Sequence, residues 1–187
     1  MIRITALVSL FMLVGCSGQT EQAADLTYEF LTSDGNAVEL LDNEKSTVVM
    51  FLSPDCPLCH SYSLSFNQLR ERFSKEVNFF GILAGDLYEK EEIDHYVDSF
   101  DFEAPIILDP DLELASTLDA SVTPQVFLLD NEGSVLYNGK IDNWAISLGR
   151  KKLKADSLYL QWALEQHLHE QDIRIAKTKP VGCVIEY

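Results

Sequence analysis

Hydrophobic and polar positions along the chain follow patterns that predict alternating strands and helices. Residues 48–52 and 77–83 are predominantly apolar, which is typical of strands covered on both faces of a sheet. Between them, apolar side chains recur every three or four residues, which predicts a helix with one buried face. That face consists of Cys59, Tyr62, Phe66, Leu69 and Phe73. The pattern therefore predicts a buried strand, a helix and a second buried strand in succession.

Further patterns extend this order. Helices are predicted over residues 89–100, 111–118 and 155–169, and a short strand over residues 105–108. Hairpins are predicted where a turn containing Gly separates apolar runs, at residues 28–31 with 37–41 and at residues 125–129 with 134–137. Strands that alternate with helices and end in a hairpin predict an α/β domain. We expect a mixed central sheet flanked by helices, with an N-terminal hairpin and a C-terminal helical extension.

The first residues differ from the rest in composition. One positive charge, Arg3, precedes a short apolar run that is too short to span a membrane, so the segment is typical of a secretory signal. The run ends in Leu13-Val14-Gly15-Cys16, which resembles the signal motif of bacterial lipoproteins. The resemblance implies cleavage before Cys16 and attachment of diacylglycerol to its thiol. The alternative is an ordinary signal peptide followed by a chance cysteine.

These features divide the chain into segments. We expect a signal peptide over residues 1–15, a small, polar and acidic tether over residues 16–25, and a domain over residues 26–187. The core of the domain is expected to extend to about residue 140, with a helix and a tail after it.

The net charge of −16 and the isoelectric point near 4.4 limit the partners of the chain. So acidic a chain offers no sizeable basic patch, which excludes nucleic-acid binding as a function class. Acidity also disfavours electrostatic docking on anionic membranes, so attachment to a membrane must come from a lipid anchor. We therefore expect a lipid-anchored protein of the cell envelope that faces the periplasm or the exterior.

The sequence Cys56-Pro57-Leu58-Cys59 lies where a buried strand is expected to turn into a helix. Free N–H groups at a helix N-terminus stabilise a thiolate, so the pKa of Cys56 should fall. Pro57 suits the first helical position, and Cys59 belongs to the buried face and should be the shielded partner. Reaction at Cys56 requires that its sulfur is open to water. The alternative is a structural disulfide between Cys56 and Cys59, although a disulfide that closes so short a loop adds little stability.

Residues from about 25 to 140 resemble the thioredoxin fold, in the branch of redoxins, peroxiredoxin-like proteins and envelope thiol–disulfide oxidoreductases. The matching features are the strand before the two cysteines, the strand-and-helix insertion after them, and Val122-Thr123-Pro124 before a strand. The resemblance implies that Thr123 and Pro124 form a cis-proline loop that lies against the cysteines and shapes the substrate groove. An ordinary turn is the alternative at this position.

Near the two cysteines, the sequence differs from the patterns of thioredoxins and of peroxiredoxins. Thioredoxins have a Trp directly before the first cysteine and an Asp six residues before it, where this chain has Asp55 and Met50. Peroxiredoxins hold peroxide with a Thr, a Pro and an Arg. Ser53 can replace the Thr, but Val49 occupies the position of the Pro, and no Arg lies between residues 72 and 150. Thiol peroxidase activity is therefore an alternative function, less well supported than disulfide exchange.

His60 follows Cys59 directly and can favour the thiolate when it is protonated. Cys56, Cys59 and His60 together match C-x-x-C-H, the motif of c-type haem attachment. Here the motif follows a buried strand of a sheet, whereas a haem domain is usually a small helical unit. Copper binding by the two cysteines and a distal histidine is a further alternative. The distal candidates are His95, His167 and His169, all on predicted helices. We expect no metal, haem or organic cofactor.

Cys183 lies near the end of the chain, in Val181-Gly182-Cys183-Val184. It can fold back as a second resolving thiol for Cys56, join another chain, or remain a free thiol, and the sequence leaves these alternatives open. The most specific expectation is a thiol–disulfide oxidoreductase in which Cys56 exchanges and Cys59 resolves. Its partner is a thiol or disulfide protein or a small-molecule thiol. The competing interpretations are a thiol peroxidase, a copper-binding protein and a non-catalytic lipoprotein.

Overall fold

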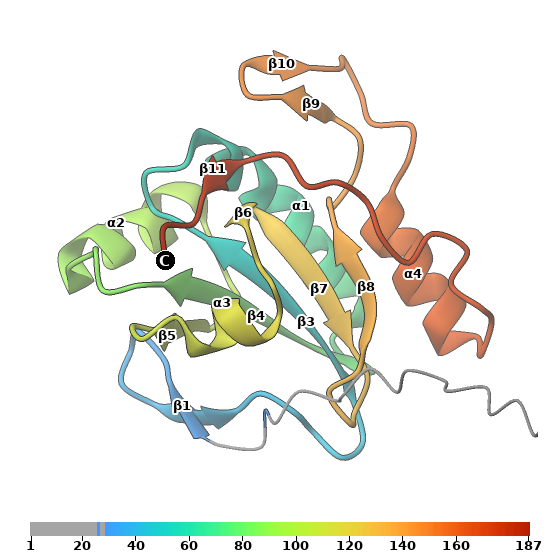
Figure 1. The fold of residues 1–187 in the computed structure, drawn as a ribbon, viewed down its shortest axis with the longest axis horizontal. Coiled ribbons are helices and arrows are strands. Elements are labelled where there is room, and N and C mark those ends of the chain that lie inside the picture. Colours follow the sequence, from blue (N-terminus) through green and yellow to red (C-terminus); the bar gives the residue numbers. More distant parts are fainter. Residues whose placement is uncertain (1–25, 27–28) are drawn as a thin grey trace, which may run out of the picture.

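The computed structural model describes residue 26 and residues 29–187, and its centre is a five-stranded mixed sheet (Figure 1). The strand order is β5-β4-β3-β7-β8. The strands are β3 (Ser46–Leu52), β4 (Val77–Ala84), β5 (Ile106–Asp109), β7 (Gln125–Leu129) and β8 (Val135–Gly139). β3 pairs parallel to β4 and antiparallel to β7, which confirms the predicted mixed α/β architecture.

Strand β3 is buried along its whole length, as its continuous apolar pattern predicts. Successive side chains of a strand point to opposite faces. Val48 and Met50 belong to one hydrophobic cluster, while Val49 and Phe51 belong to the other. Both faces of the sheet are therefore covered, and the two cysteines follow shortly after the end of β3, the central strand of the sheet.

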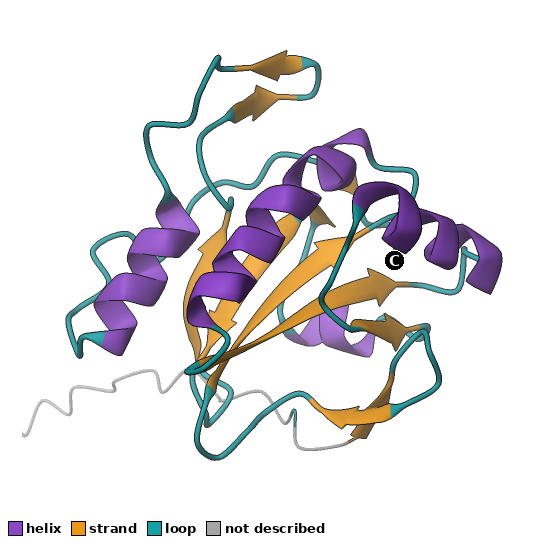
Figure 2. Cartoon of the chain, turned by 180° about the vertical axis from the view of Figure 1, so that it is seen from behind, coloured by secondary structure: helices purple, strands orange, loops and turns teal. Residues whose placement is uncertain are grey.

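Helices cover both faces of the sheet, unequally. The larger layer consists of α1 (Pro57–Phe73), α2 (Lys90–Phe100) and α4 (Tyr159–Leu168), seen in front of the sheet in Figure 2. The opposite face is covered by α3 (Glu113–Thr117) and by the hairpin of β1 (Glu29–Leu31) and β2 (Ala37–Glu39). Both predicted hairpins are confirmed, because β1 pairs antiparallel to β2 and β7 pairs antiparallel to β8.

The predicted start of the last helix, at residue 155, is wrong, because α4 begins at Tyr159. Its buried side chains are Leu160, Ala163 and Leu164, whereas Leu158 and Trp162 are only half-buried. The segment before α4 instead forms a small hairpin of β9 (Ala145–Ser147) and β10 (Arg150–Lys151), which stands apart from the main sheet.

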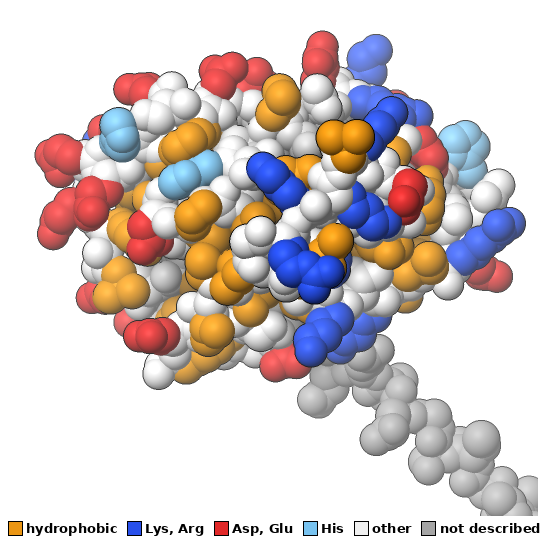
Figure 3. Space-filling model, turned by 90° about the horizontal axis from the view of Figure 1, so that it is seen from above, with side chains coloured by type: hydrophobic (Ala, Val, Ile, Leu, Met, Phe, Trp, Pro, Cys, Tyr) orange, Lys and Arg blue, Asp and Glu red, His pale blue; other side chains and the backbone are white. Residues whose placement is uncertain are grey.

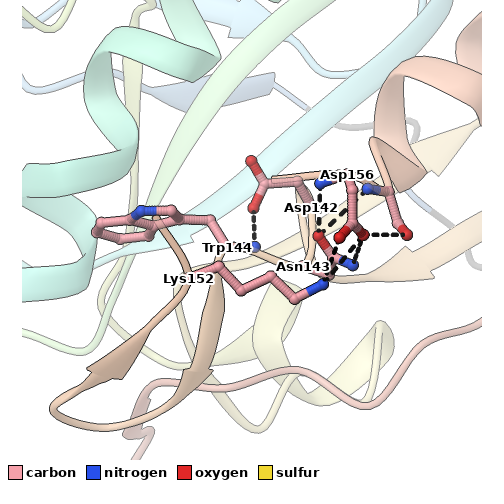
Figure 4. A network of polar contacts seen from close by, with 6 residues as sticks. Asp142, Asn143, Trp144, Lys152 and Asp156 are labelled. Atoms are coloured by element: carbon pink, nitrogen blue, oxygen red, sulfur yellow. Dashed lines mark hydrogen bonds and ion pairs between the residues drawn. The ribbon is translucent and has the colours of Figure 1, made fainter. Parts of the chain in front are cut away.

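A polar network holds the base of this small hairpin (Figure 4). The carboxylate of Asp142 accepts the N–H of Trp144 at 2.8 Å, and Lys152 forms an ion pair with Asp156 at 3.0 Å. The side chain of Asn143 donates to the same Asp156 at 2.6 Å. These contacts tie the two ends of the hairpin segment together.

The C-terminal tail adds one short strand, β11 (Cys183–Val184), which pairs with the short strand β6 (Val122–Thr123), and the sequence pattern predicted neither. The pairing is antiparallel, so the tail lies beside the segment that precedes β7 (Figure 1). On the way there, the tail passes β8, where the N–H of Thr178 donates to the carbonyl of Asn138 at 2.9 Å. The end of the chain therefore lies against the centre of the fold.

The predicted signal peptide, the tether and Cys16 lie outside the described residues. Within the described part of the chain, no helix is long and apolar enough to cross a membrane. Seen from above, acidic side chains are numerous on the left of the surface, and basic side chains gather toward the right (Figure 3).

Candidate redox site

Cys56 is the N-cap residue of α1, directly after the turn that follows β3. Its N–H donates to the carbonyl of Ser53 at 3.1 Å, and its own carbonyl accepts the N–H of His60 at 3.2 Å. Pro57 occupies the first turn, where no donor is required. The predicted placement of Cys56 at the positive end of a helix is therefore confirmed.

Cys59 lies one turn further along α1 and is fully buried, as predicted for the shielded partner. The hydroxyl of Ser63 donates to the carbonyl of Cys59 at 3.1 Å and lies 2.9 Å from the hydroxyl of Tyr96. Burial, and then the neighbouring Cys56, raise the pKa of Cys59 well above its ordinary value. Cys59 is therefore protonated at neutral pH.

The Thr123–Pro124 bond is cis, which confirms the conformation that the resemblance implied. In its protonated form, the thiol of Cys56 donates to the carbonyl of Thr123 at 3.2 Å. The cis-proline loop thus lies directly against the first cysteine.

Cys183 reaches the same site from the C-terminal tail. Its thiol donates to the sulfur of Cys56, with 3.1 Å between the two Sγ atoms. Of the three arrangements that the sequence left open, the structure has the tail folded back onto Cys56. The three cysteines in the described part of the chain are all reduced.

The electrostatics of the three sulfurs are strongly unequal. Hydrogen bonds from the thiol of Cys59, from the thiol of Cys183 and from backbone N–H groups lower the pKa of Cys56 to about 4, against the opposing effect of burial. Burial and the neighbouring Cys56 raise the pKa of Cys183 to about 11. Cys56 is therefore the one thiolate of this group at neutral pH.

The expectation that the sulfur of Cys56 is open to water is wrong for this conformation. Cys56 is 1% exposed, because Thr123 lies against it and the tail brings Cys183 over it. The sequence gives no periodicity in residues 178–187 from which this cover could be predicted. Any reaction of Cys56 with an external molecule requires the tail to move or to take part.

His60 is half-buried beside the cysteines but turned away from them. Its Nε2 lies 2.5 Å from the carbonyl of Pro54, and its ring stacks on Phe100 with 3.9 Å between centroids. The main interactions that lower the pKa of Cys56 come from other groups, so the modulating role predicted for His60 stays a prediction.

The distal histidines that were candidates for copper make contacts elsewhere. His95 lies near Ser99 on α2, Nε2 of His167 lies 2.6 Å from the hydroxyl of Ser46, and Nδ1 of His169 lies 2.6 Å from the carbonyl of Glu165. Among residues 29–187, no group of three or more His, Cys, Asp or Glu side chains is arranged to hold a metal ion.

Two polar residues near the site were not singled out from the sequence as functional. The hydroxyl of Tyr88 donates to the carboxylate of Asp55 at 2.5 Å and lies 2.8 Å from the hydroxyl of Ser53, which also donates to Asp55. Tyr96 is linked to Cys59 by Ser63, whose hydroxyl contacts both the hydroxyl of Tyr96 and the carbonyl of Cys59. Both tyrosines belong to the strand-and-helix region that is inserted after the two cysteines. The positions of the two tyrosines in the sequence do not by themselves indicate that either side chain lies near the cysteines.

Residues 18–145 match the family model described as Redoxin. The chain belongs to the redoxin family. This redoxin has a thioredoxin-like fold, as solved structures indicate. It is similar to an uncharacterized conserved protein from Geobacillus kaustophilus, with a TM-score of 0.75, 21% identity and coverage of 90% of this chain and 94% of that one.

Smaller parts of this redoxin are similar to proteins whose names state a function. One is the exposed lipoprotein thioredoxin Etrx1 of Streptococcus pneumoniae, at TM-score 0.56 and 15% identity, covering 74% of this chain and 98% of that one. Another is a secreted disulfide oxidoreductase of Mycobacterium tuberculosis, at TM-score 0.51 and 19% identity, covering 59% and 81%. A search of curated protein sequences found no match.

Proposed function

We propose that this redoxin is a thiol–disulfide oxidoreductase of the cell envelope in which Cys56 exchanges disulfides and Cys59 resolves them. The observation that carries the proposal is the position of Cys56, at the N-cap of α1 and against the carbonyl of Thr123, with its pKa lowered to about 4. A thiolate at neutral pH is the species that attacks a disulfide. Membership of the redoxin family supports thiol redox chemistry in general.

The reaction needs only sulfur chemistry. The thiolate of Cys56 attacks one sulfur of a substrate disulfide, which forms a mixed disulfide and releases the other sulfur as a thiolate. Cys59 then loses its proton and attacks Cys56, so a Cys56–Cys59 disulfide forms and the second substrate thiol leaves with that proton. The reverse sequence oxidises a substrate dithiol. Each step exchanges one S–S bond for another, so the mechanism needs no organic cofactor.

The substrate is a disulfide or dithiol of a protein partner, or a small-molecule thiol. The segment that ends in Thr123 and Pro124 presents the backbone edge of β6 next to Cys56, and an extended peptide can pair with such an edge. In the described conformation, this edge is already paired with β11. A protein substrate therefore has to exchange places with the tail.

The location of the protein rests on the N-terminal segment. The motif that ends at Cys16 supports a lipid anchor, and one similar structure is that of an exposed lipoprotein. Replacement of Cys16 (Cys16→Ser) is expected to move the protein from the membrane fraction to the soluble fraction of a bacterial host. Fractionation followed by immunoblotting measures this, and unchanged membrane association would contradict lipidation at Cys16.

Trapping of a mixed disulfide tests the exchange mechanism. The double variant Cys59→Ser, Cys183→Ser should accumulate a covalent adduct on Cys56 with a peptide that contains a disulfide, because both thiols that lie next to Cys56 and can displace the peptide are missing. Cys56→Ser should form no adduct at Cys59, which is fully buried. Ser61→Ala is the matched control, because Ser61 is exposed on the same helix turn. No adduct in the double variant, together with an inert wild type, would disprove the proposed exchange.

A further inference from the structure

The C-terminal tail pairs as an added strand with β6, directly before the cis-proline, and forms a two-stranded sheet with it. Cys183 pairs with Thr123 and Val184 pairs with Val122, both in antiparallel register. The pairing continues as the N–H of Ile185 donates to the carbonyl of Ser121 at 3.0 Å. A strand added to an exposed edge is one of the general ways in which an extended peptide binds a protein. The tail therefore lies where a peptide ligand of this edge would lie.

Gly182 makes this close approach possible. A β-carbon on Gly182 would lie 2.0 Å from the carbonyl oxygen of Thr123 and 3.1 Å from the nitrogen of Pro124, so any other residue would displace the tail. Both atoms belong to backbone, which cannot move aside as the end of a flexible side chain can. The contact between tail and cis-proline loop is therefore specific for glycine directly before Cys183.

Anchors on both sides of Cys183 hold the tail. Before it, the hydroxyl of Thr178 accepts the N–H of Lys140 at 2.8 Å and lies 2.9 Å from the hydroxyl of Tyr137. After it, Ile185 is buried in the cluster on the α3 face of the sheet, and the hydroxyl of Tyr187 donates to the carbonyl of Ala120. The sulfur of Cys183 is thus held at Cys56 by contacts that do not involve either sulfur.

The two sulfurs differ in how external molecules can reach them. Cys56 is 1% exposed, whereas Cys183 is partly exposed and lines an open groove of about 350 Å³. Asp55 and Tyr88 lie on the wall of the same groove, but Cys56 does not. An external thiol or disulfide that enters the groove therefore meets Cys183 before it meets Cys56.

We propose that Cys183 is a third redox residue of this site, which takes over the disulfide from Cys59 so that the oxidised chain carries a Cys56–Cys183 bond. In this exchange, the tail acts as a tethered substrate that occupies the peptide edge. The inference rests on the proposed function, because the disulfide that Cys183 takes over is the one that the Cys56–Cys59 pair forms.

The exchange balances without any further oxidant. The thiolate of Cys183 attacks the sulfur of Cys56, the Cys56–Cys59 bond breaks, and Cys59 leaves as a thiolate that takes up the proton lost by Cys183. The two sulfurs must approach by about 1 Å, from 3.1 Å to the length of an S–S bond. In the oxidised state, Cys56 carries no charge, so its contribution to the high pKa of Cys183 disappears when Cys183 has to ionise.

The outcome is a disulfide that faces the groove. When an external thiolate attacks Cys183, Cys56 leaves as the thiolate of lower pKa, which is the favoured leaving group. While the tail is docked, the Cys56–Cys59 pair thereby exchanges electrons with a partner through Cys183.

Peptide mapping of the oxidised chain tests this inference. The full chain with Cys16→Ser, which removes the fourth thiol, is equilibrated with glutathione and glutathione disulfide, blocked by alkylation and digested with trypsin. Cys56 and Cys59 share the tryptic peptide of residues 46–70, and Cys183 lies in residues 178–187, because Pro180 protects the bond after Lys179. A Cys56–Cys183 disulfide therefore joins two peptides, whereas a Cys56–Cys59 disulfide joins none. We expect the joined species in the mass spectrum.

Variants assign the bond and test the geometry. The joined species should persist in Cys59→Ser and disappear in Cys56→Ser. Gly182→Ala should lower its yield on the order of tenfold or more, because the tethered thiol loses its effective concentration at Cys56. Val184→Ala should leave the yield unchanged, since the side chain of Val184 is 77% exposed and only its backbone pairs with Val122.

The result separates this inference from the function on which it rests. A Cys56–Cys59 disulfide that forms while no joined species appears would overturn the role of Cys183 and leave the exchange function intact. If neither disulfide forms at any ratio of the glutathione buffer, the proposed function is overturned and the role of Cys183 with it. An unchanged yield in Gly182→Ala would show that the bond does not depend on the docked tail, which also overturns the inference.

Discussion

The sulfur of Cys183 lies 3.1 Å from the sulfur of Cys56, although the two residues are 127 positions apart in the chain. Because the thiol of Cys183 donates to Cys56, the end of the chain contributes to the acidity of the residue that begins the chemistry. A helix N-terminus, a neighbouring cation or a second cysteine of the same motif is the usual cause of a low cysteine pKa. Here the hydrogen bond from Cys59 lowers the pKa of Cys56 most, and the docked tail lowers it further through Cys183.

The first prediction concerns the pH at which Cys56 ionises. In the reduced chain, the thiolate should be present above about pH 4 and should disappear as the pH falls through that value. Cys183→Ala removes a hydrogen bond to the thiolate, so the pKa of Cys56 should rise in this variant. The ultraviolet absorbance of the thiolate, recorded against pH, measures both values.

Stability against pH gives an independent check of the same shift. The folded pKa of Cys56 is lower than its ordinary value of 9.0, so the contribution to stability is complete above that value and is lost as the pH falls toward 4. Relative to Cys56→Ser, the reduced wild type should therefore gain unfolding free energy between pH 4 and 9. Equal pH dependence of the two proteins would contradict the lowered pKa.

The second prediction concerns access to Cys56. With 1% of its surface exposed, Cys56 should react slowly with iodoacetamide in spite of its thiolate, whereas Gly182→Ala should react on the order of tenfold faster or more. Val184→Ala serves as the control, because Val184 points to solvent. Alkylation of the peptide of residues 46–70 is followed by mass spectrometry. Rapid labelling of wild type at the Gly182→Ala rate would show that the tail does not protect Cys56.

Most of the central sheet could be predicted from the sequence, because its strands and α1 have strong local patterns. The run of Ser46–Leu52 and the periodicity from Cys59 to Phe73 each reflect burial within one element. The hairpin of β9 and β10 could not be predicted in the same way. Its position is set by contacts such as that of Tyr62 with Asp142, which join residues far apart in the chain.

The candidate redox site likewise has features that could be predicted from the sequence and features that could not. The N-cap position of Cys56 and the burial of Cys59 follow from the spacing within one strand–helix unit, and the cis bond before Pro124 follows from the family resemblance. The docking of Cys183 depends on backbone pairing with β6 and on the missing side chain of Gly182. Backbone pairing and a missing side chain produce no periodic pattern in so short a tail. The burial of Cys56 under the tail could therefore not be predicted from the sequence.

The third prediction concerns Met50, which lies where thioredoxins have a buried aspartate. Met50 is fully buried in the hydrophobic cluster that also contains both cysteines. Met50→Asp should lower the unfolding free energy by about 3–5 kcal/mol, because it removes apolar volume and buries a carboxyl group. Met50→Leu keeps the volume and should cost less than about 1.5 kcal/mol. Urea unfolding at neutral pH compares the two, and equal stability would show that the cluster accommodates a carboxyl group.

The fourth prediction concerns the contact that fixes the small hairpin to α1. The hydroxyl of Tyr62 donates to the carboxylate of Asp142 at 2.7 Å and accepts the N–H of Ala145 at 3.2 Å. Burial, and to a smaller extent the hydrogen bond to Asp142, raise the pKa of Tyr62, so its hydroxyl keeps the proton that it donates. Tyr62→Phe removes both bonds while Asp142 remains buried, so the unfolding free energy should fall by about 1.5–3 kcal/mol.

Hydrogen exchange locates the effect of Tyr62→Phe. The amide of Ala145 loses its acceptor and should exchange faster, whereas amides in the centre of β3 should change only as much as global stability changes. Asp156→Asn is the comparison, since it weakens the exposed ion pair with Lys152 and should cost clearly less stability. If Tyr62→Phe and Asp156→Asn destabilise the chain equally, the hairpin is held by its surface network and not by α1.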